Sequence, residues 1–240
     1  MIRAYLDLLD VDPQAFIVLV GAVVSALLLG FTFHEFSHAL AATRLGDPTP
    51  RFRGRLTLNP LAHLDPAGTV LLFLAGFGWG KPVPVNPSLM RGDPKTNMAI
   101  TAAAGPLSNL VVAGVAGLAI KLDIVPWRSP FNVPHLASWA FDDYLGLYLS
   151  SIVIFGVILA VFNLIPLFPL DGFSVAVGVL PGDLSRAFEE LRAWGPGILF
   201  LLLAMPFVFG GRFGLLFQIM APAVNGLIRV LAGIDGNVLG

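Results

Sequence analysis

Four long stretches without charged side chains dominate this sequence of 240 residues. They hold no Asp, Glu, Lys or Arg over 19 to 27 residues each, and they cover 13–33, 96–120, 144–170 and 193–211. A helix of about 20 apolar residues crosses the roughly 30 Å hydrocarbon core of a bilayer, because each residue adds about 1.5 Å. Each stretch is therefore predicted to span a membrane as a helix.

Two shorter uncharged runs need a separate interpretation. The run at 213–228 has 16 residues and is marginal for a span, while the run at 66–80 has 15 and ends in Gly-Phe-Gly-Trp-Gly. Because glycine weakens a helix, we expect 66–80 to form a re-entrant or interfacial hairpin. The expected fold is an all-α polytopic membrane protein with about five to six transmembrane helices and a re-entrant or β-like membrane-associated segment.

Composition and charge agree with a membrane protein. Only 12% of the residues are charged and 56% are hydrophobic, whereas soluble proteins have about 25% charged residues. A soluble enzyme and a disordered chain are therefore not expected, and a net charge of −1 gives no reason to expect nucleic acid as a partner. The lack of cysteine excludes disulfides and thiolate metal ligands.

Basic residues between the runs set the expected orientation. Residues 44–63 contain four arginines and 81–95 contain three basic residues, whereas 121–143 contains two basic and three acidic ones. Cytoplasmic loops of membrane proteins are enriched in Lys and Arg. The first two segments are therefore predicted to be cytoplasmic, and the third segment and the N-terminus are predicted to lie outside.

Two connecting segments carry weak strand patterns. Residues 51–58 alternate in character and are predicted to form a short strand. Residues 81–86, Lys-Pro-Val-Pro-Val-Asn, hold β-branched residues but also two prolines, so an edge or irregular strand is expected. Free backbone groups at such an edge could pair with an extended peptide.

The first long run leads directly into His34-Glu35-Phe36-Ser37-His38. Residues four apart lie on one face of a helix, so both imidazoles can bind one metal ion. Glu35 would then be placed to take a proton from water, whose pKa zinc lowers toward about 7. The alternative is a buried polar patch, but charged groups in a membrane helix cost about 2.5–3.5 kcal/mol each and usually mark function. The sequence therefore predicts a zinc site with Glu35 as its base.

A catalytic zinc ion usually has three protein ligands, so a third is needed. The candidates are His63, Asp65, His135 and Asp171. His135 is expected in the outer loop, and a turn or interfacial contact is the simpler role for His63 and Asp65. Asp171 follows two prolines that should break the helix and turn the chain inward. Spacing alone leaves a metal ligand and an ordinary helix end as equal alternatives for Asp171.

The two motifs together resemble the signatures of the site-2 proteases, a family of intramembrane zinc metalloproteases. The matching residues are His34-Glu-Phe-Ser-His38 and Asn163-x-x-Pro-x-x-Pro-Leu-Asp171-Gly172. The resemblance covers roughly residues 30–172, and it includes Leu58-Asn-Pro-Leu-Ala-His-Leu-Asp-Pro-x-Gly68, Gly80-Lys-Pro-Val-Pro-Val-Asn86 and Ala104-Gly-Pro-Leu-Ser-Asn109.

The resemblance implies one zinc ion per chain held by His34, His38 and Asp171, with Glu35 as general base. It also implies cleavage of a substrate helix within the membrane, often to release a transcription regulator in regulated intramembrane proteolysis. The partners would be the lipid bilayer and a membrane protein with a transmembrane helix. The expected location is the cell membrane, with the active site near the cytoplasmic side.

The family often carries a PDZ or CBS domain, but neither fits here. No segment between the predicted spans exceeds about 25 residues, which is far below the size of a domain. Some members also have a span before the motif-bearing helix, and none is expected here. We therefore predict a single membrane-embedded protease domain over 1–240, with the catalytic core at 13–172 and C-terminal transmembrane helices in 173–240.

Three asparagines receive weaker predictions. Asn86 falls in a region that the resemblance assigns to a substrate-contacting loop, and the alternative is a turn residue before proline. Asn163 is a weak candidate for substrate binding, and it could also orient a ligand or hold the broken helix. Asn109 is expected to hydrogen-bond between helices, and the small residues at 113–117 are expected to allow close helix packing.

The predicted function is that of an intramembrane zinc metalloendopeptidase that cleaves transmembrane segments. The main alternative is a metal or proton transporter that uses His34, Glu35 and His38 as an ion site. Transporters often have inverted repeats and ionisable groups along a path, whereas the polar groups here cluster at one depth. A third alternative is an inactive relative that binds membrane proteins without cutting them, and the intact Glu35 argues against it.

Overall fold

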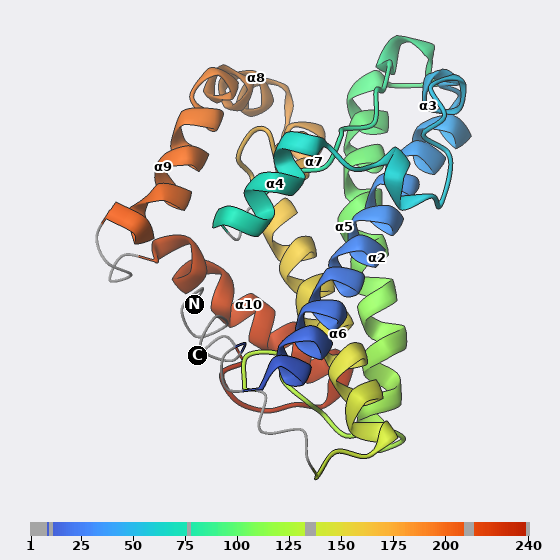
Figure 1. Ribbon diagram of the computed structural model, residues 1–240. Coiled ribbons are helices and arrows are strands. Elements are labelled where there is room, and N and C mark those ends of the chain that lie inside the picture. The colour runs from blue at the N-terminus through green and yellow to red at the C-terminus, as the bar shows by residue number, and fades with distance from the viewer. Residues whose placement is uncertain (1–8, 10–11, 76–77, 133–137, 209–213, 239–240) are drawn as a thin grey trace. The chain divides into compact units, whose positions relative to one another are not determined.

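The computed structural model describes residues 9, 12–75, 78–132, 138–208 and 214–238 (Figure 1). Within these residues, all regular structure is helical and no strand is present. Four helices are long and apolar enough to cross a membrane, and they are α2 (Pro13–Leu45), α5 (Pro94–Lys121), α6 (Phe141–Asn163) and α10 (Leu215–Ala232). The predicted all-α character is confirmed for the described residues.

The helices and the uncharged runs differ at their ends. Helix α2 continues past the run at 13–33, through both histidines, to Leu45. Helix α9 (Gly195–Val208) has 14 residues and is about 21 Å long, shorter than the roughly 30 Å core of a bilayer. The marginal run at 213–228 instead contributes to α10. The count of five to six spans therefore stays a prediction.

Both strand predictions are wrong for the described residues. Residues 51–58 begin inside the short helix α3 (Thr49–Phe52), and the chain then turns at Gly54, which has a φ of +67°. Residues 81–86 form neither helix nor strand, because two prolines remove N–H groups that a ladder needs. The only strand-like pairing among the described residues is one isolated antiparallel bridge between Leu64 and Gly80.

The remaining elements are short. They are η1 (Pro60–Ala62), α4 (Pro66–Ala75), η2 (Pro87–Leu89), α7 (Asp171–Val179), α8 (Gly182–Glu190) and η4 (Leu191–Ala193). Contacts divide the chain into two compact units, one of residues 1–30, 110–158 and 221–240 and the other of 31–109 and 159–220. A single domain over 1–240 stays a prediction.

The first unit is held by close packing of apolar helices. Leu19 of α2 and Leu147 of α6 are buried in one cluster. Helices α5 and α10 approach closely at Gly117, where an added Cβ would lie 2.8 Å from the carbonyl oxygen of Leu231. This contact confirms the close helix packing that was predicted for the small residues at 113–117.

In the second unit, the two ends of the segment around α4 lie side by side. The Lys81 N–H donates to the His63 carbonyl over 2.8 Å, beside the bridge between Leu64 and Gly80. The buried guanidinium group of Arg55 donates to the carbonyl oxygens of Ala62 and Lys81. The Arg55 side chain thus holds the two ends of the segment next to each other.

Buried Asp47 fixes the chain that follows. Its carboxylate accepts the Asn86 N–H over 2.6 Å and the Thr49 N–H over 2.9 Å. Burial raises the pKa of Asp47, but these hydrogen bonds outweigh burial and hold the pKa below its usual value. The charged carboxylate therefore anchors the end of the 81–86 segment next to the end of α2.

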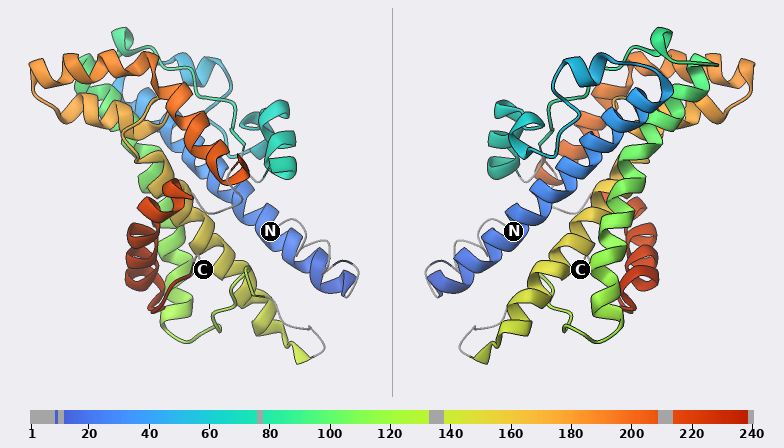
Figure 2. Two further views of the ribbon diagram at one scale, coloured as in Figure 1. Left: turned by 90° about the vertical axis from the view of Figure 1, so that its left-hand side faces the viewer. Right: turned by 90° about the vertical axis from the view of Figure 1, so that its right-hand side faces the viewer.

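The segment between α6 and α7 brings Asp171 to the first residue of a helix. Helix α6 ends at Asn163, and the prolines at 166 and 169 prevent its regular continuation. The Arg192 guanidinium lies 5.1 Å from the ring centroids of both Phe168 and Phe173. These two residues precede and follow Asp171 in the sequence. Helices α7 and α8 pack side by side (Figure 2). These contacts fix the position of the Asp171 backbone.

Candidate metal centre

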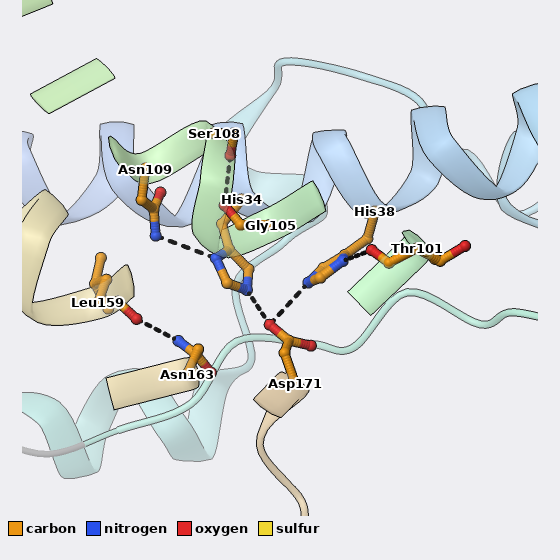
Figure 3. A network of polar contacts seen from close by, with 9 residues as sticks. All are labelled: His34, His38, Thr101, Gly105, Ser108, Asn109, Leu159, Asn163 and Asp171. Carbon is orange, nitrogen blue, oxygen red and sulfur yellow. Dashed lines mark hydrogen bonds and ion pairs between the residues drawn. The ribbon is translucent and has the colours of Figure 1, made fainter. Parts of the chain in front are cut away.

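The two motif histidines lie one turn apart on α2, and both are buried. The centroids of the His34 and His38 rings are 4.6 Å apart, and the ring planes meet at 87°. Their Nε2 atoms point toward the same carboxylate (Figure 3). The spacing of four residues therefore places both imidazoles as expected for two ligands of one metal ion.

That carboxylate belongs to Asp171. Its Oδ2 atom lies 3.0 Å from His34 Nε2 and 3.2 Å from His38 Nε2. One ligand atom from each of the three residues lies within 4.8 Å of the other two, and they form the one metal-binding group found among the described residues. The structure thus brings together three of the sequence-predicted ligand candidates.

The residues fit a zinc ion by their chemistry. Asp171 Oδ2 is buried and has no hydrogen-bond partner within the described residues, although it lies close to two imidazole nitrogens. Ligand atoms of a tetrahedral zinc site stand about 2.0–2.2 Å from the metal, and hence about 3.3–3.6 Å from one another. The observed separations of 3.0 and 3.2 Å from Oδ2 are slightly shorter than this range, and a cation between the three groups would give the unpartnered oxygen a partner.

Two groups of α5 contact the Nδ1 atoms of the imidazole rings, whose Nε2 atoms face Asp171 (Figure 3). His38 Nδ1–H donates to the Thr101 carbonyl over 2.7 Å, and Asn109 Nδ2 lies 3.1 Å from His34 Nδ1. A carbonyl oxygen can only accept, so the His38 proton is fixed on Nδ1 and Nε2 is free to bind a metal. The predicted interhelical contact of Asn109 is confirmed, and its partner is a candidate metal ligand.

Gly105 lies between these two positions and faces both rings. A Cβ at this position would lie 2.4 Å from His38 Nε2 and 2.7 Å from His34 Nε2. Real Cβ atoms do not approach other atoms so closely, and ring nitrogens on a packed helix have little room to move. Glycine is therefore the residue that leaves space for the two imidazoles here.

Glu35 lies beside this group and is not part of it. Its Oε2 is buried without a hydrogen-bond partner in the described part of the chain, and its Oε1 lies 3.8 Å from where a Cβ on Gly80 would stand. The buried Arg55 lies close enough to Glu35 for an electrostatic interaction. Burial lowers the pKa of Arg55, and the Glu35 carboxylate partly opposes this shift. Oε2 thus makes no hydrogen bond to another described residue.

The other candidate ligands have different partners. His63 Nε2 lies 2.8 Å from the Thr57 carbonyl oxygen, and Asp65 accepts the Gly68 N–H at the start of α4. Neither side chain is part of the three-residue group. His135 lies outside the described residues.

The two weak candidates for substrate binding make local hydrogen bonds. The Asn86 side chain accepts the Ser88 N–H and caps η2, which agrees with the turn interpretation. The Asn163 amide donates to the Leu159 carbonyl one turn earlier, at the end of α6. A role for either residue in substrate binding stays a prediction.

Sequence reasoning assigned no role to Thr101 and Gly105. With Asn109 they form a series spaced by four residues on α5, which matches the spacing of His34 and His38 on α2. Two helix faces with the same period can meet residue by residue. This shared spacing is the feature of the sequence from which the face of α5 that contacts the histidines could have been predicted.

Comparison with curated proteins identifies relatives over most of the chain. The chain is 35% identical over 184 residues to "Putative zinc metalloprotease YwhC" of Bacillus subtilis, and the match covers 77% of this chain and 80% of that protein. It is 29% identical over 236 residues to "Putative zinc metalloprotease Rip2" of Mycobacterium tuberculosis, covering 95% of this chain and 83% of that protein.

Rip2 of Mycolicibacterium smegmatis is 29% identical over 203 residues, covering 82% of this chain and 71% of that protein. No protein-family model and no solved structure matches the chain. The named activity of these relatives agrees with the His34, His38 and Asp171 group, and zinc is accordingly the cofactor. The chain belongs to the site-2 protease family of zinc metalloproteases.

Proposed function

We propose that this protein is an intramembrane zinc endopeptidase that cleaves transmembrane segments of membrane-protein substrates. The observation that carries the proposal is the convergence of His34, His38 and Asp171 on one point, with Glu35 next to His34 on the same helix and its buried Oε2 without a hydrogen-bond partner among the described residues. Both histidines lie on a helix that is apolar and long enough to cross a membrane. Buried ionisable groups on such a helix are expected to be functional.

Each polar side chain has a distinct role in this proposal. His34, His38 and Asp171 would hold the zinc ion, which when bound supplies a Lewis acid for peptide hydrolysis. Glu35 takes a proton from the attacking water and returns it to the leaving amine. The Oε2 atom of Glu35 is buried, and burial strengthens its interaction with the reacting groups.

The segment 81–86 is the proposed binding edge for an unwound substrate. Its exposure alternates, with Val83 and Val85 half-buried and their neighbours exposed. Within the described part of the chain, no hydrogen bond involves the backbone groups of these two valines. A peptide in a helix satisfies its own backbone, so the substrate must unwind before it can pair with this edge. The proposed site is therefore best suited to substrates with helix-breaking residues in the membrane.

Cleavage of purified substrate tests the function directly. The protein should be reconstituted with zinc and a model membrane protein that has one transmembrane helix containing a helix-breaking residue. We expect mass spectrometry to locate the cut within the apolar segment, and removal of the metal with a chelator should stop cleavage until zinc is restored. Movement of zinc or protons across the vesicle membrane without any cleavage would instead identify a transporter.

We further propose that the α4 segment returns to its starting side and that the site lies near the cytoplasmic face. The adjacent ends of this segment, fastened by Arg55, support the return. An excess of basic residues at 44–63 and 81–95 supports the cytoplasmic location. Cleavage at this depth would release a domain of the substrate on the cytoplasmic side, as regulated intramembrane proteolysis requires.

Single cysteines test this orientation, because the chain has none of its own. Cysteine at position 53 and cysteine at position 93, both exposed, should be labelled by an impermeant thiol reagent only when the cytoplasmic face is accessible. Phe131→Cys, an exposed position in the segment predicted to lie outside, should be labelled in intact cells and provides the control. Labelling of positions 53 and 93 from opposite faces would rule out a returning segment.

A further inference from the structure

The two candidate histidine ligands are supported in different ways. His38 Nδ1 faces a backbone carbonyl, which can only accept a hydrogen bond. His34 Nδ1 faces the side-chain amide of Asn109, which presents its Nδ2 at 3.1 Å. An amide has a donor on one side and an acceptor on the other, so it is compatible with a proton on either nitrogen of His34.

The orientation of the Asn109 amide decides where the His34 proton can lie. With Nδ2 facing Nδ1 at 3.1 Å, the amide could only donate, and Nδ1 could not carry the proton. A nitrogen that carries a proton cannot bind a metal ion. The proton of His34 must therefore be on Nδ1 whenever Nε2 is a zinc ligand, and it then requires an acceptor.

Asn109 carries the acceptor that this arrangement needs. Its side chain is completely buried, and its Oδ1 has no hydrogen-bond partner among the described residues. A half-turn of the amide exchanges Oδ1 and Nδ2 at almost the same positions and needs no additional space. Because Oδ1 makes no hydrogen bond before the turn, none of its contacts is lost.

We propose that Asn109 is a positioning residue that fixes the tautomer of His34, by accepting Nδ1–H through its Oδ1 and leaving Nε2 free for zinc. The inference rests on the proposed zinc site and goes beyond it by assigning a role to a residue that does not touch the metal. Acceptors that orient metal-bound histidines typically change metal affinity by about 10- to 100-fold when they are removed.

Zinc affinity of the purified protein, measured by competition with a chromophoric chelator, tests the proposal without relying on proteolysis. Asn109→Leu keeps a similar volume and removes the acceptor, so we expect zinc affinity to fall about 10- to 100-fold. Asn109→Asp keeps an acceptor facing Nδ1 and should retain affinity close to that of the wild type. Ser108→Ala is the matched control, because it removes a hydrogen bond to Gly105 from the same turn of α5 and leaves both imidazoles untouched.

Nitrogen NMR of labelled histidine adds a measurement that a purely structural role would not change. In the zinc-loaded wild type, the His34 proton should be on Nδ1 and hydrogen-bonded to Asn109, whereas in zinc-loaded Asn109→Leu the signal of this nitrogen should shift because the acceptor is missing. Equal zinc affinity in Asn109→Leu and wild type, or the same His34 Nδ1 signal in both zinc-loaded proteins, would overturn the proposal. A wild-type protein that binds no zinc would instead contradict the proposed metal site itself.

Discussion

Replacing Glu35 with glutamine should lower the rate of substrate cleavage by about 10²-fold or more, while the protein keeps close to one zinc ion per chain. Glutamine has nearly the same shape as glutamate, but it cannot take a proton from water, and general-base catalysis contributes about 10²–10⁴-fold. The proposed ligands His34, His38 and Asp171 are unchanged in this variant, and Glu35 is not part of their group. The zinc content of this variant should therefore stay at the wild-type level while its cleavage rate falls.

The measurement needs wild type and variant purified in parallel, with metal analysis and a cleavage assay on the same samples. Glu189→Gln is a suitable control, because it also removes one negative charge but lies half-exposed on α8, within 3.7 Å of Arg192. This control should cleave at the wild-type rate. Wild-type cleavage by Glu35→Gln would show that another group provides the base.

Much of the fold could be predicted because the bilayer imposes a length on uncharged segments. The run at 96–120 corresponds to α5 within a few residues. The end of α2 could not be predicted in this way, since the motif histidines and Glu35 interrupt the apolar pattern although the helix continues to Leu45. Helix continuation there depends on packing of the polar residues around the site, which a count of charges does not describe.

Charge counting also misses what Arg55 does. In the sequence, Arg55 is one of four arginines in a predicted cytoplasmic loop, and each of them counts equally toward the predicted orientation of the chain in the membrane. The structure buries Arg55, and its guanidinium group donates to the two carbonyls that close the α4 segment. Arg51 and Arg53 remain exposed. Which arginine is buried depends on the return of the chain at Lys81, and this is a contact between distant residues.

The candidate metal ligands were accessible to sequence reasoning because their chemistry is specific. A spacing of four predicts that His34 and His38 share a face, whereas spacing left a metal ligand and an ordinary helix end as equal alternatives for Asp171, and only the family resemblance favoured the ligand. The support from α5 was not accessible in the same way. Thr101 contributes a backbone carbonyl and Gly105 contributes the absence of a side chain. Neither contribution depends on a reactive group that a motif search would notice.

Replacing Asp171 with alanine should weaken zinc binding by at least about 100-fold, because removal of a direct ligand should cost at least as much as removal of an outer partner. The helices that enter the membrane are unchanged, so the variant should still insert. Alanine is also compatible with the first turn of α7, where the N-cap residue Leu170 makes no side-chain cap hydrogen bond. Chelator competition on the purified variant measures the affinity, and membrane fractionation measures insertion.

Asp183→Ala provides the matched control, since this aspartate also lies in the first turn of a helix, α8, but is exposed and paired with Arg186. The control should bind zinc as the wild type does. His38→Ala should lose zinc to the same extent as Asp171→Ala, because three protein ligands define the proposed site. Full zinc retention in Asp171→Ala would remove this residue from the site and leave His63 and Asp65, on the neighbouring loop, as the next ligands to test.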